Sequence, residues 1–169
     1  MLFVYKLLVK GKVTITTAAM ESKVTIKSLV FNTGDDYKMI FIRLIVGSVF
    51  ILEGILKYLV VEVYGPSFFD EIGFRNAFFW AYLTGAIEVL CGTLVILGLL
   101  TRLASIPLII IMITAFLTTK LPLLSSNGFW AFAHQYTTDF SMTMLLIVLI
   151  IYGGGKWSLD SKAFRSDHA

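Results

Sequence analysis

Four long apolar segments constrain the fold of this chain more than any other feature. They are Met39–Val63, Ala77–Leu100, Leu103–Thr119 and Thr137–Tyr152. A helix needs roughly 20 residues to cross a bilayer, within a range of about 17 to 25. The first two segments meet that length, and flanking residues such as Leu121 can extend the shorter ones. The sequence therefore predicts an all-α membrane protein, a bundle of four transmembrane helices.

The composition favours lipid over water as the solvent. The chain of 169 residues is 57% hydrophobic and 15% charged, whereas soluble domains are roughly a quarter charged. A domain this small cannot bury so much apolar surface in a core of its own. The net charge of +3 is small and forms no single strong patch. We therefore expect lipid headgroups rather than nucleic acid as the partner of the basic residues.

Lysine and arginine are concentrated on one side of the predicted membrane. That side carries Lys6, Lys10, Lys12, Lys23, Lys27, Lys38, Arg43, Arg102, Lys156, Lys162 and Arg165. The other side carries only Lys57, Arg75 and Lys120. Because basic residues favour the cytoplasmic side, both termini are expected in the cytoplasm. The loops at roughly 64–76 and 120–136, which are rich in aromatic residues, are expected outside.

Residues 1–37 form a polar N-terminal extension. The tetrapeptide KVTI occurs twice, at Lys12–Ile15 and Lys23–Ile26, and its alternation is typical of a strand. A short hairpin and a weakly ordered or amphipathic tail both remain open. The apolar start is short and interrupted by lysine, so no cleaved signal peptide is expected. The chain is thus divided into an extension (1–37), a membrane domain (38–160) and a cytoplasmic tail (161–169).

Ionisable residues lie inside the apolar segments, where a charge is costly. In the first helix Arg43, Gly47, Gly54 and Lys57 share one face, and Glu53 lies beside it, four residues before Lys57. In the second helix Gly85, Glu88 and Gly92 form a similar face. Small residues let helix backbones approach closely in lipid. The glycines therefore predict that Glu88 lies at a helix–helix interface, away from lipid.

The expected depths bring several of these groups into one layer. Glu88 is near the middle of its helix, and Glu53 is about 5 Å farther out at 1.5 Å per residue. Lys57 and Asp139 fall in the outer third, and His134 lies beyond them. Glu88, Lys57 and Asp139 are the candidate catalytic groups. Candidate cofactor contacts are Glu53, Glu88, Lys57, Cys91 and His134.

A purely structural role competes with this hypothesis. A buried ion pair can fix the register of two helices without any chemistry. Lys57 alone can reach the interface with its long side chain, and Arg43 and Arg102 are most simply topology anchors. The single cysteine, Cys91, excludes an intramolecular disulfide. With two histidines, His134 and His168, no zinc pattern and no bis-histidine haem site are expected.

Three sequence stretches resemble the DoxX family of small four-helix membrane proteins. They are RLIVGSVFILEGILK (43–57), GAIEVLCGTLVILGLLTRLASIPL (85–108) and TTDFSMTMLLIVLIIYGGGKWSLD (137–160). The resemblance covers about residues 38–160. The matching positions are Arg43, Gly47, Gly54, Lys57, Gly85, Glu88, Gly92, Gly98, Thr101, Arg102, Gly155, Ser158 and Asp160. Asp139 falls where the family often has an acidic residue, and Glu53 does not match a fixed position.

The resemblance implies a subunit of a quinone-linked oxidoreductase complex in the bacterial cytoplasmic (inner) membrane. Such a subunit contributes a quinone and proton site or docks a catalytic partner, and is at most one part of an enzyme. No intrinsic cofactor is evident, and ubiquinone or menaquinone is the expected ligand. A membrane or peripheral redox protein and a second copy of the chain are the expected partners. A non-enzymatic anchor or assembly protein, and a bundle that binds lipid or another small molecule, remain the alternatives.

Overall fold

The computed structural model describes residues 37–166, with side chains to Lys162, and this part is helical without strands. Its elements are α3 (Met39–Leu59), α4 (Val61–Tyr64), α5 (Pro66–Glu71), α6 (Ala77–Leu97), α7 (Thr101–Ala115), a π-helical segment η1 (Phe116–Lys120), α8 (Leu121–Tyr152) and α9 (Leu159–Ser166). The all-α prediction is confirmed for these residues. The two KVTI repeats of the N-terminal extension lie outside the described residues.

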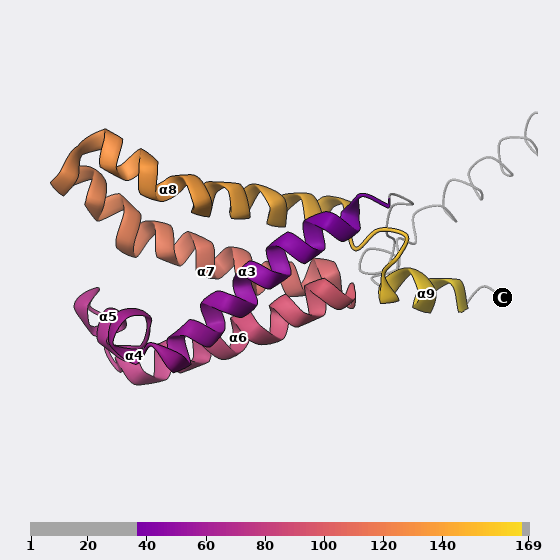
Figure 1. The fold of residues 1–169 in the computed structure, drawn as a ribbon, viewed down its shortest axis with the longest axis horizontal. Helices are drawn as coiled ribbons and strands as arrows, with labels where there is room; N and C mark the ends of the chain where they lie inside the picture. The colour runs from indigo at the N-terminus through magenta and orange to yellow at the C-terminus, as the bar shows by residue number, and fades with distance from the viewer. Residues whose placement is uncertain (1–36, 167–169) are drawn as a thin grey trace, which may run out of the picture.

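Three stretches of the described chain are long and apolar enough to cross a membrane. They are Met39–Leu59, Ala77–Leu97 and Thr101–Tyr152. The last is 52 residues long and contains one non-helical residue, Gly128, with φ 81° and ψ 173°. At this residue the chain turns back, so α7 and the later part of α8 lie antiparallel (Figure 1). A hydrogen bond of 2.9 Å from Arg102 Nη2 to the Ile151 carbonyl joins the far ends of this hairpin.

The expected loops differ from the structure. Residues 120–136 were expected to connect two helices as a loop, but they are helical except at Gly128. The segment is rich in apolar and aromatic residues, and helix formation satisfies its backbone groups within the segment. Only glycine tolerates the φ and ψ found at residue 128 without strain. Similarly, the expected loop at 64–76 contains α5, which begins at Pro66, a favoured first helical residue.

Helices α3 and α6 form the first antiparallel pair through facing glycines. A Cβ atom placed on Gly54 would lie 2.7 Å from the Gly85 carbonyl oxygen. A Cβ atom on Gly92 would lie 2.9 Å from the Gly47 carbonyl oxygen. Any side chain at these positions would therefore force the backbones apart. The glycine pattern of the sequence correctly predicted this close contact.

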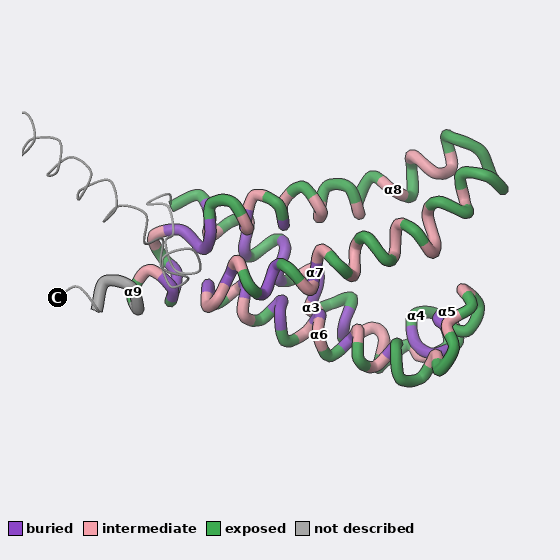
Figure 2. The backbone as a smooth tube through the Cα atoms, turned by 180° about the vertical axis from the view of Figure 1, so that it is seen from behind, coloured by how far each residue is buried: buried purple, intermediate pink, exposed green. Residues whose placement is uncertain are grey.

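The two pairs of helices, α3–α6 and α7–α8, meet at the end that carries α9 and diverge toward the end that carries α5 (Figure 1). The core lies near the α9 end, where Figure 2 shows most of the buried backbone. It consists of Val46, Phe50, Cys91, Val95, Ala104, Leu108, Leu146 and Leu149.

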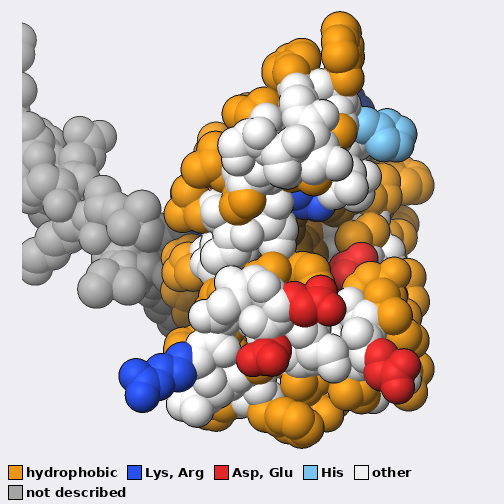
Figure 3. Space-filling model, turned by 90° about the vertical axis from the view of Figure 1, so that its left-hand side faces the viewer, with side chains coloured by type: hydrophobic (Ala, Val, Ile, Leu, Met, Phe, Trp, Pro, Cys, Tyr) orange, Lys and Arg blue, Asp and Glu red, His pale blue; other side chains and the backbone are white. Residues whose placement is uncertain are grey.

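Figure 3 views the α5 end, where acidic side chains spread over one half of the surface and hydrophobic side chains surround them.

Candidate functional site

Lys57 and Glu88 form an ion pair between α3 and α6. Lys57 Nζ lies 2.6 Å from Glu88 Oε2, and the side chains are 11% and 4% exposed. The glycine contacts bring the two residues together, because a Cβ on Gly54 would lie 3.1 Å from the Glu88 Cβ. Lys57 Nζ also donates a hydrogen bond of 3.3 Å to the backbone carbonyl of Glu53. The Glu53 side chain itself is exposed.

The Lys57–Glu88 pair keeps unused hydrogen-bonding capacity. A lysine ammonium has three N–H donors and a carboxylate has two oxygens that accept. In the described part of the chain, Lys57 uses two donors, and the second Glu88 oxygen, Oε1, accepts no hydrogen bond. That oxygen is not fully buried. The site can therefore donate one hydrogen bond to a bound group and accept another from it.

Asp139 lies in a second ion pair. Its Oδ2 is 3.4 Å from Lys120 Nζ, with 24% of the Asp139 and 19% of the Lys120 side chain exposed. This pair joins η1 to α8 within the hairpin. No hydrogen bond or ion pair between described residues connects it to Lys57 or Glu88. The single polar layer expected from helix depth is thus divided into two pairs.

The other sequence candidates lie elsewhere. Cys91 is 6% exposed and packs in the hydrophobic core with Val46 and Phe50. His134 is exposed on α8. Within residues 37–166, no group of three or more His, Cys, Asp or Glu side chains is arranged to hold a metal ion. Of the predicted residues, the structure therefore brings together Lys57 and Glu88, with Glu53 joined through its backbone.

Arg43 forms a separate polar centre near the α9 end. The sequence favours a topology anchor at this position, but the side chain is buried, with the residue 2% exposed. Its Nε donates to the Val95 carbonyl (2.9 Å) and its Nη2 to the Ile96 carbonyl (2.5 Å). Its Nη1 donates to the carbonyls of Gly154 (2.9 Å) and Trp157 (3.1 Å). Carbonyls in the last turn of a helix run short of helical partners, and the guanidinium supplies donors there, although the Val95 carbonyl also accepts from the Gly98 N–H at 3.1 Å.

Asp160 completes this centre from the C-terminal segment. It is 1% exposed and accepts hydrogen bonds from the backbone N–H groups of Leu100 (2.7 Å) and Thr101 (3.0 Å). The Thr101 hydroxyl donates a third bond of 3.1 Å. A carboxylate is favourable at a helix N-terminus, here that of α7. The motif ending in W-S-L-D was visible in the sequence, but its bonds to backbone groups about 60 residues away were not.

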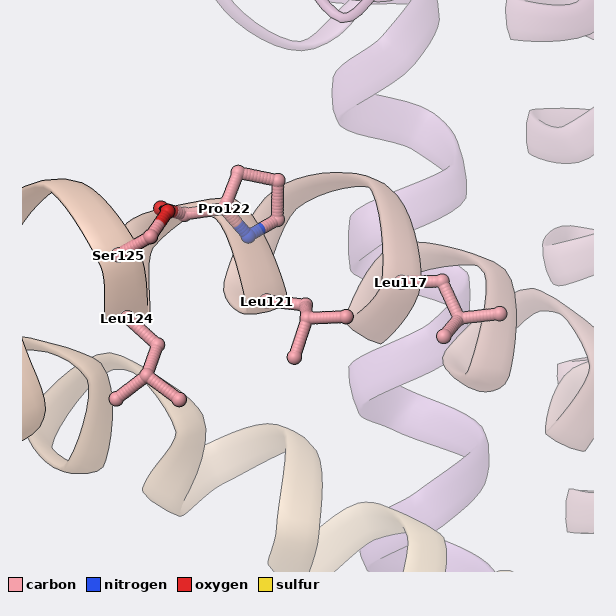
Figure 4. Close-up of a pocket in the computed structure, with 5 residues that line it drawn as sticks. All are labelled: Leu117, Leu121, Pro122, Leu124 and Ser125. Carbon is pink, nitrogen blue, oxygen red and sulfur yellow. The ribbon is translucent and has the colours of Figure 1, made fainter.

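Two shallow apolar grooves lie on the surface. One of about 540 Å³ is lined by Leu117, Leu121, Pro122, Leu124 and Ser125 (Figure 4). The other, of about 550 Å³, is lined by Ile55, Tyr58, Ala86, Val89, Leu90 and Thr93. The second groove lies on the α3–α6 pair that also carries Lys57 and Glu88. Neither groove is lined by an acidic or basic residue, so the ion pair remains the stronger candidate site.

Comparison with known proteins identifies the family. Residues 39–121 match the model of the DoxX family. An uncharacterized membrane protein of Mycobacterium tuberculosis is 48% identical over 130 residues, which cover 73% of this chain and 80% of the relative. A Bacillus subtilis protein named "Putative oxidoreductase CatD" is 30% identical over 129 residues, covering 75% of this chain and 87% of the relative. No solved structure matches. The chain belongs to the DoxX family of membrane proteins.

Proposed function

We propose that this protein is a membrane subunit of a quinone-linked oxidoreductase complex, in which Lys57 and Glu88 contact the quinone headgroup. The observation that carries the proposal is the 2.6 Å contact between Lys57 Nζ and Glu88 Oε2 at the α3–α6 crossing. An ionisable residue inside a membrane is costly and marks a functional site by default. Because the pair keeps one unused donor and one unused acceptor, it can bind a ligand as well as neutralise its own charges.

The chemistry of the pair suits a quinone headgroup. A quinone carbonyl accepts hydrogen bonds, and Lys57 has one N–H that no described residue uses. A quinol hydroxyl donates a hydrogen bond and must release its proton when the quinol is oxidised, and the free oxygen of Glu88 can accept that proton. A bound quinone would supply the redox chemistry, and a redox centre on the proposed partner subunit would be the electron acceptor for its quinol form. The name of the Bacillus subtilis relative supports a redox class.

The proposal includes a bacterial cytoplasmic membrane and four crossings with both termini inside. Helices α3 and α6 provide two crossings. The turn at Gly128 divides the 52-residue stretch into two arms, which provide two more. The distribution of lysine and arginine then places α9 in the cytoplasm and α5 outside. The Lys57–Glu88 pair lies between the middle of the membrane and its outer face.

A purification with quinone extraction tests the function. The full chain is isolated in a mild detergent together with associated proteins, and the eluate is analysed for quinone and by optical spectroscopy. Glu88→Gln removes the carboxylate without changing its size and should abolish copurifying quinone and quinol-linked activity. The matched control is Glu62→Gln, the same change at an exposed residue of α4.

The two outcomes separate function from architecture. Loss of quinone in Glu88→Gln, with normal amounts of folded protein and normal quinone in Glu62→Gln, supports the proposed site. A quinone-free wild-type protein, or equal quinone in both variants, overturns it. In that case the pair serves to fix helix register, and an anchor or assembly role becomes the better explanation.

A further inference from the structure

The outward face of α8 carries a row of polar residues. The residues are His134, Thr137, Thr138 and Ser141, and all four are exposed. Their spacing of three and four residues places them on one side of the helix. The opposite side packs on η1, where Phe116 meets Phe132 and Tyr136 with ring centroids 6.2 and 5.0 Å apart. The four residues, here called the α8 polar stripe, therefore lie on a side of α8 that η1 does not cover.

The position of the stripe along α8 makes it unusual for a surface in contact with lipid. Ser141 is 11 residues from Tyr152, the last residue of α8. At 1.5 Å per residue this is about 17 Å, roughly half the thickness of a bilayer hydrocarbon core. His134 lies about 10 Å farther along the same helix. In the proposed four-crossing arrangement, the stripe extends from the middle of the membrane into its outer half.

Lipid does not satisfy the groups on this stripe. The Thr137 and Ser141 hydroxyls donate to carbonyls of their own helix, at 2.8 and 2.9 Å. Their oxygen lone pairs remain available as acceptors. His134 and Thr138 make no hydrogen bond within the described part of the chain. By contrast, the exposed residues Leu103, Ile106, Ile110 and Ile113 of α7 are aliphatic and suit lipid tails.

We propose that the α8 polar stripe is the interface of a homodimer and that a second copy of this chain covers it. Two copies in one membrane share the same topology, so a two-fold axis along the membrane normal brings residues of equal depth together. The stripe has no carboxylate or ammonium group, and hydroxyl and imidazole groups can serve as both donors and acceptors of hydrogen bonds. It is therefore complementary to itself, whereas a charged stripe would repel its own copy. Polar side chains are known to join helices inside membranes.

Cysteine cross-linking in membranes tests this interface. In a Cys91→Ser background, which removes the single native cysteine, Thr138→Cys and Ser141→Cys place a thiol on the stripe. Oxidation should yield a disulfide-linked dimer of the chain for both variants. Ile110→Cys is the matched control, because this α7 residue is 58% exposed but lies on an aliphatic face. Ile110→Cys should form no disulfide cross-link under the same conditions, although its α8 polar stripe is intact.

A second variant tests the role of the polar groups without breaking the fold. The combined changes His134→Leu, Thr138→Leu and Ser141→Leu affect only exposed positions, so the monomer should still fold and insert. Dimer measured by size in nanodiscs or by cross-linking at a neighbouring cysteine should be lost. The proposal is overturned by absence of stripe cross-links in correctly inserted protein. Equal cross-linking of Ile110→Cys, or a cross-linked product with a different protein, overturns it as well.

The dimer test is independent of the quinone experiment. The stripe lies on α8, whereas Lys57 and Glu88 lie between α3 and α6. A quinone-free homodimer would refute the proposed function and support the interface. A quinone-containing monomer would give the reverse result.

Discussion

At the scale of single residues, the two basic side chains of α3, Arg43 and Lys57, have different surroundings. Arg43 is enclosed, and four backbone carbonyls accept its hydrogen bonds. Lys57 binds one carboxylate and one carbonyl and retains an unused donor. The guanidinium uses four of its five N–H donors, and the residue is 2% exposed, so it stabilises the structure and leaves little room for a ligand. The Glu88 oxygen that accepts no hydrogen bond therefore makes Lys57 and Glu88, rather than Arg43, the better candidate for a reactive centre.

Replacing Arg43 should destabilise the protein. Arg43→Leu leaves the carbonyls of Ile96, Gly154 and Trp157 without this donor, while Val95 still accepts from the Gly98 N–H. Each orphaned buried group costs about 1–3 kcal/mol before the structure relaxes. We expect Tm in detergent to fall clearly, with only partial rescue by Arg43→Lys, because an ammonium lacks the planar fork of a guanidinium. Thermal unfolding monitored by circular dichroism measures the Tm of each variant. An unchanged Tm in Arg43→Leu would refute the structural role.

At the scale of secondary structure elements, the α3–α6 contact positions the site. Gly47 and Gly54 of α3 and Gly85 and Gly92 of α6 all lie within helices, so their backbone conformation is ordinary. They matter because they leave space for the two backbones to approach each other. The ion pair between these helices depends on their separation and register. A larger backbone separation at Gly54 or Gly85 would therefore also increase the distance between Lys57 and Glu88.

Gly54→Ala should separate the two helices. Its Cβ would lie 2.7 Å from the Gly85 carbonyl oxygen, and overpacking of this kind costs about 1–3 kcal/mol. We expect a lower Tm and loss of copurifying quinone in the same variant. Ser48→Ala, an exposed position on the same helix, serves as the control. Normal Tm and quinone content in Gly54→Ala would show that the close contact is dispensable.

At the scale of the whole molecule, the polar centre at the α9 end holds the helices together. Arg43 joins α3 to α6 and to the segment before α9, and Asp160 joins α9 itself to α7. Toward the α5 end the two pairs of helices diverge (Figure 1). The Lys57–Glu88 and Lys120–Asp139 pairs therefore belong to different halves of the molecule.

The proposed topology can be tested with single cysteines in the Cys91→Ser background. Ser67→Cys places a thiol on α5, and Lys162→Cys places one on α9, both at exposed positions. A membrane-impermeant maleimide should label Ser67→Cys in cells with an intact cytoplasmic membrane. It should label Lys162→Cys only after that membrane is permeabilised. The opposite pattern would show that the protein has the inverse orientation in the membrane. Equal labelling of both variants before permeabilisation would contradict the four-crossing arrangement.

Much of the helical architecture was accessible from the sequence. Apolar length predicted α3 and α6, and the spacing of Gly54 and Gly85 predicted the face through which they pack. The pairing of Lys57 with Glu88 followed from that face and from helix depth. The helical character of residues 120–136 was missed, because their aromatic residues and a glycine were interpreted as an outer loop.

The sequence by itself determined which segments are apolar helices and which helix faces carry charge, because both are local properties of residue spacing. Only the tertiary structure decided the partner of each charge. Asp139 pairs with Lys120 because the chain reverses at Gly128. Arg43 is buried because the C-terminal segment returns to the end of α6. The Arg43 bonds join residues far apart in the chain through backbone carbonyls, which every residue carries and which leave no signal in a sequence.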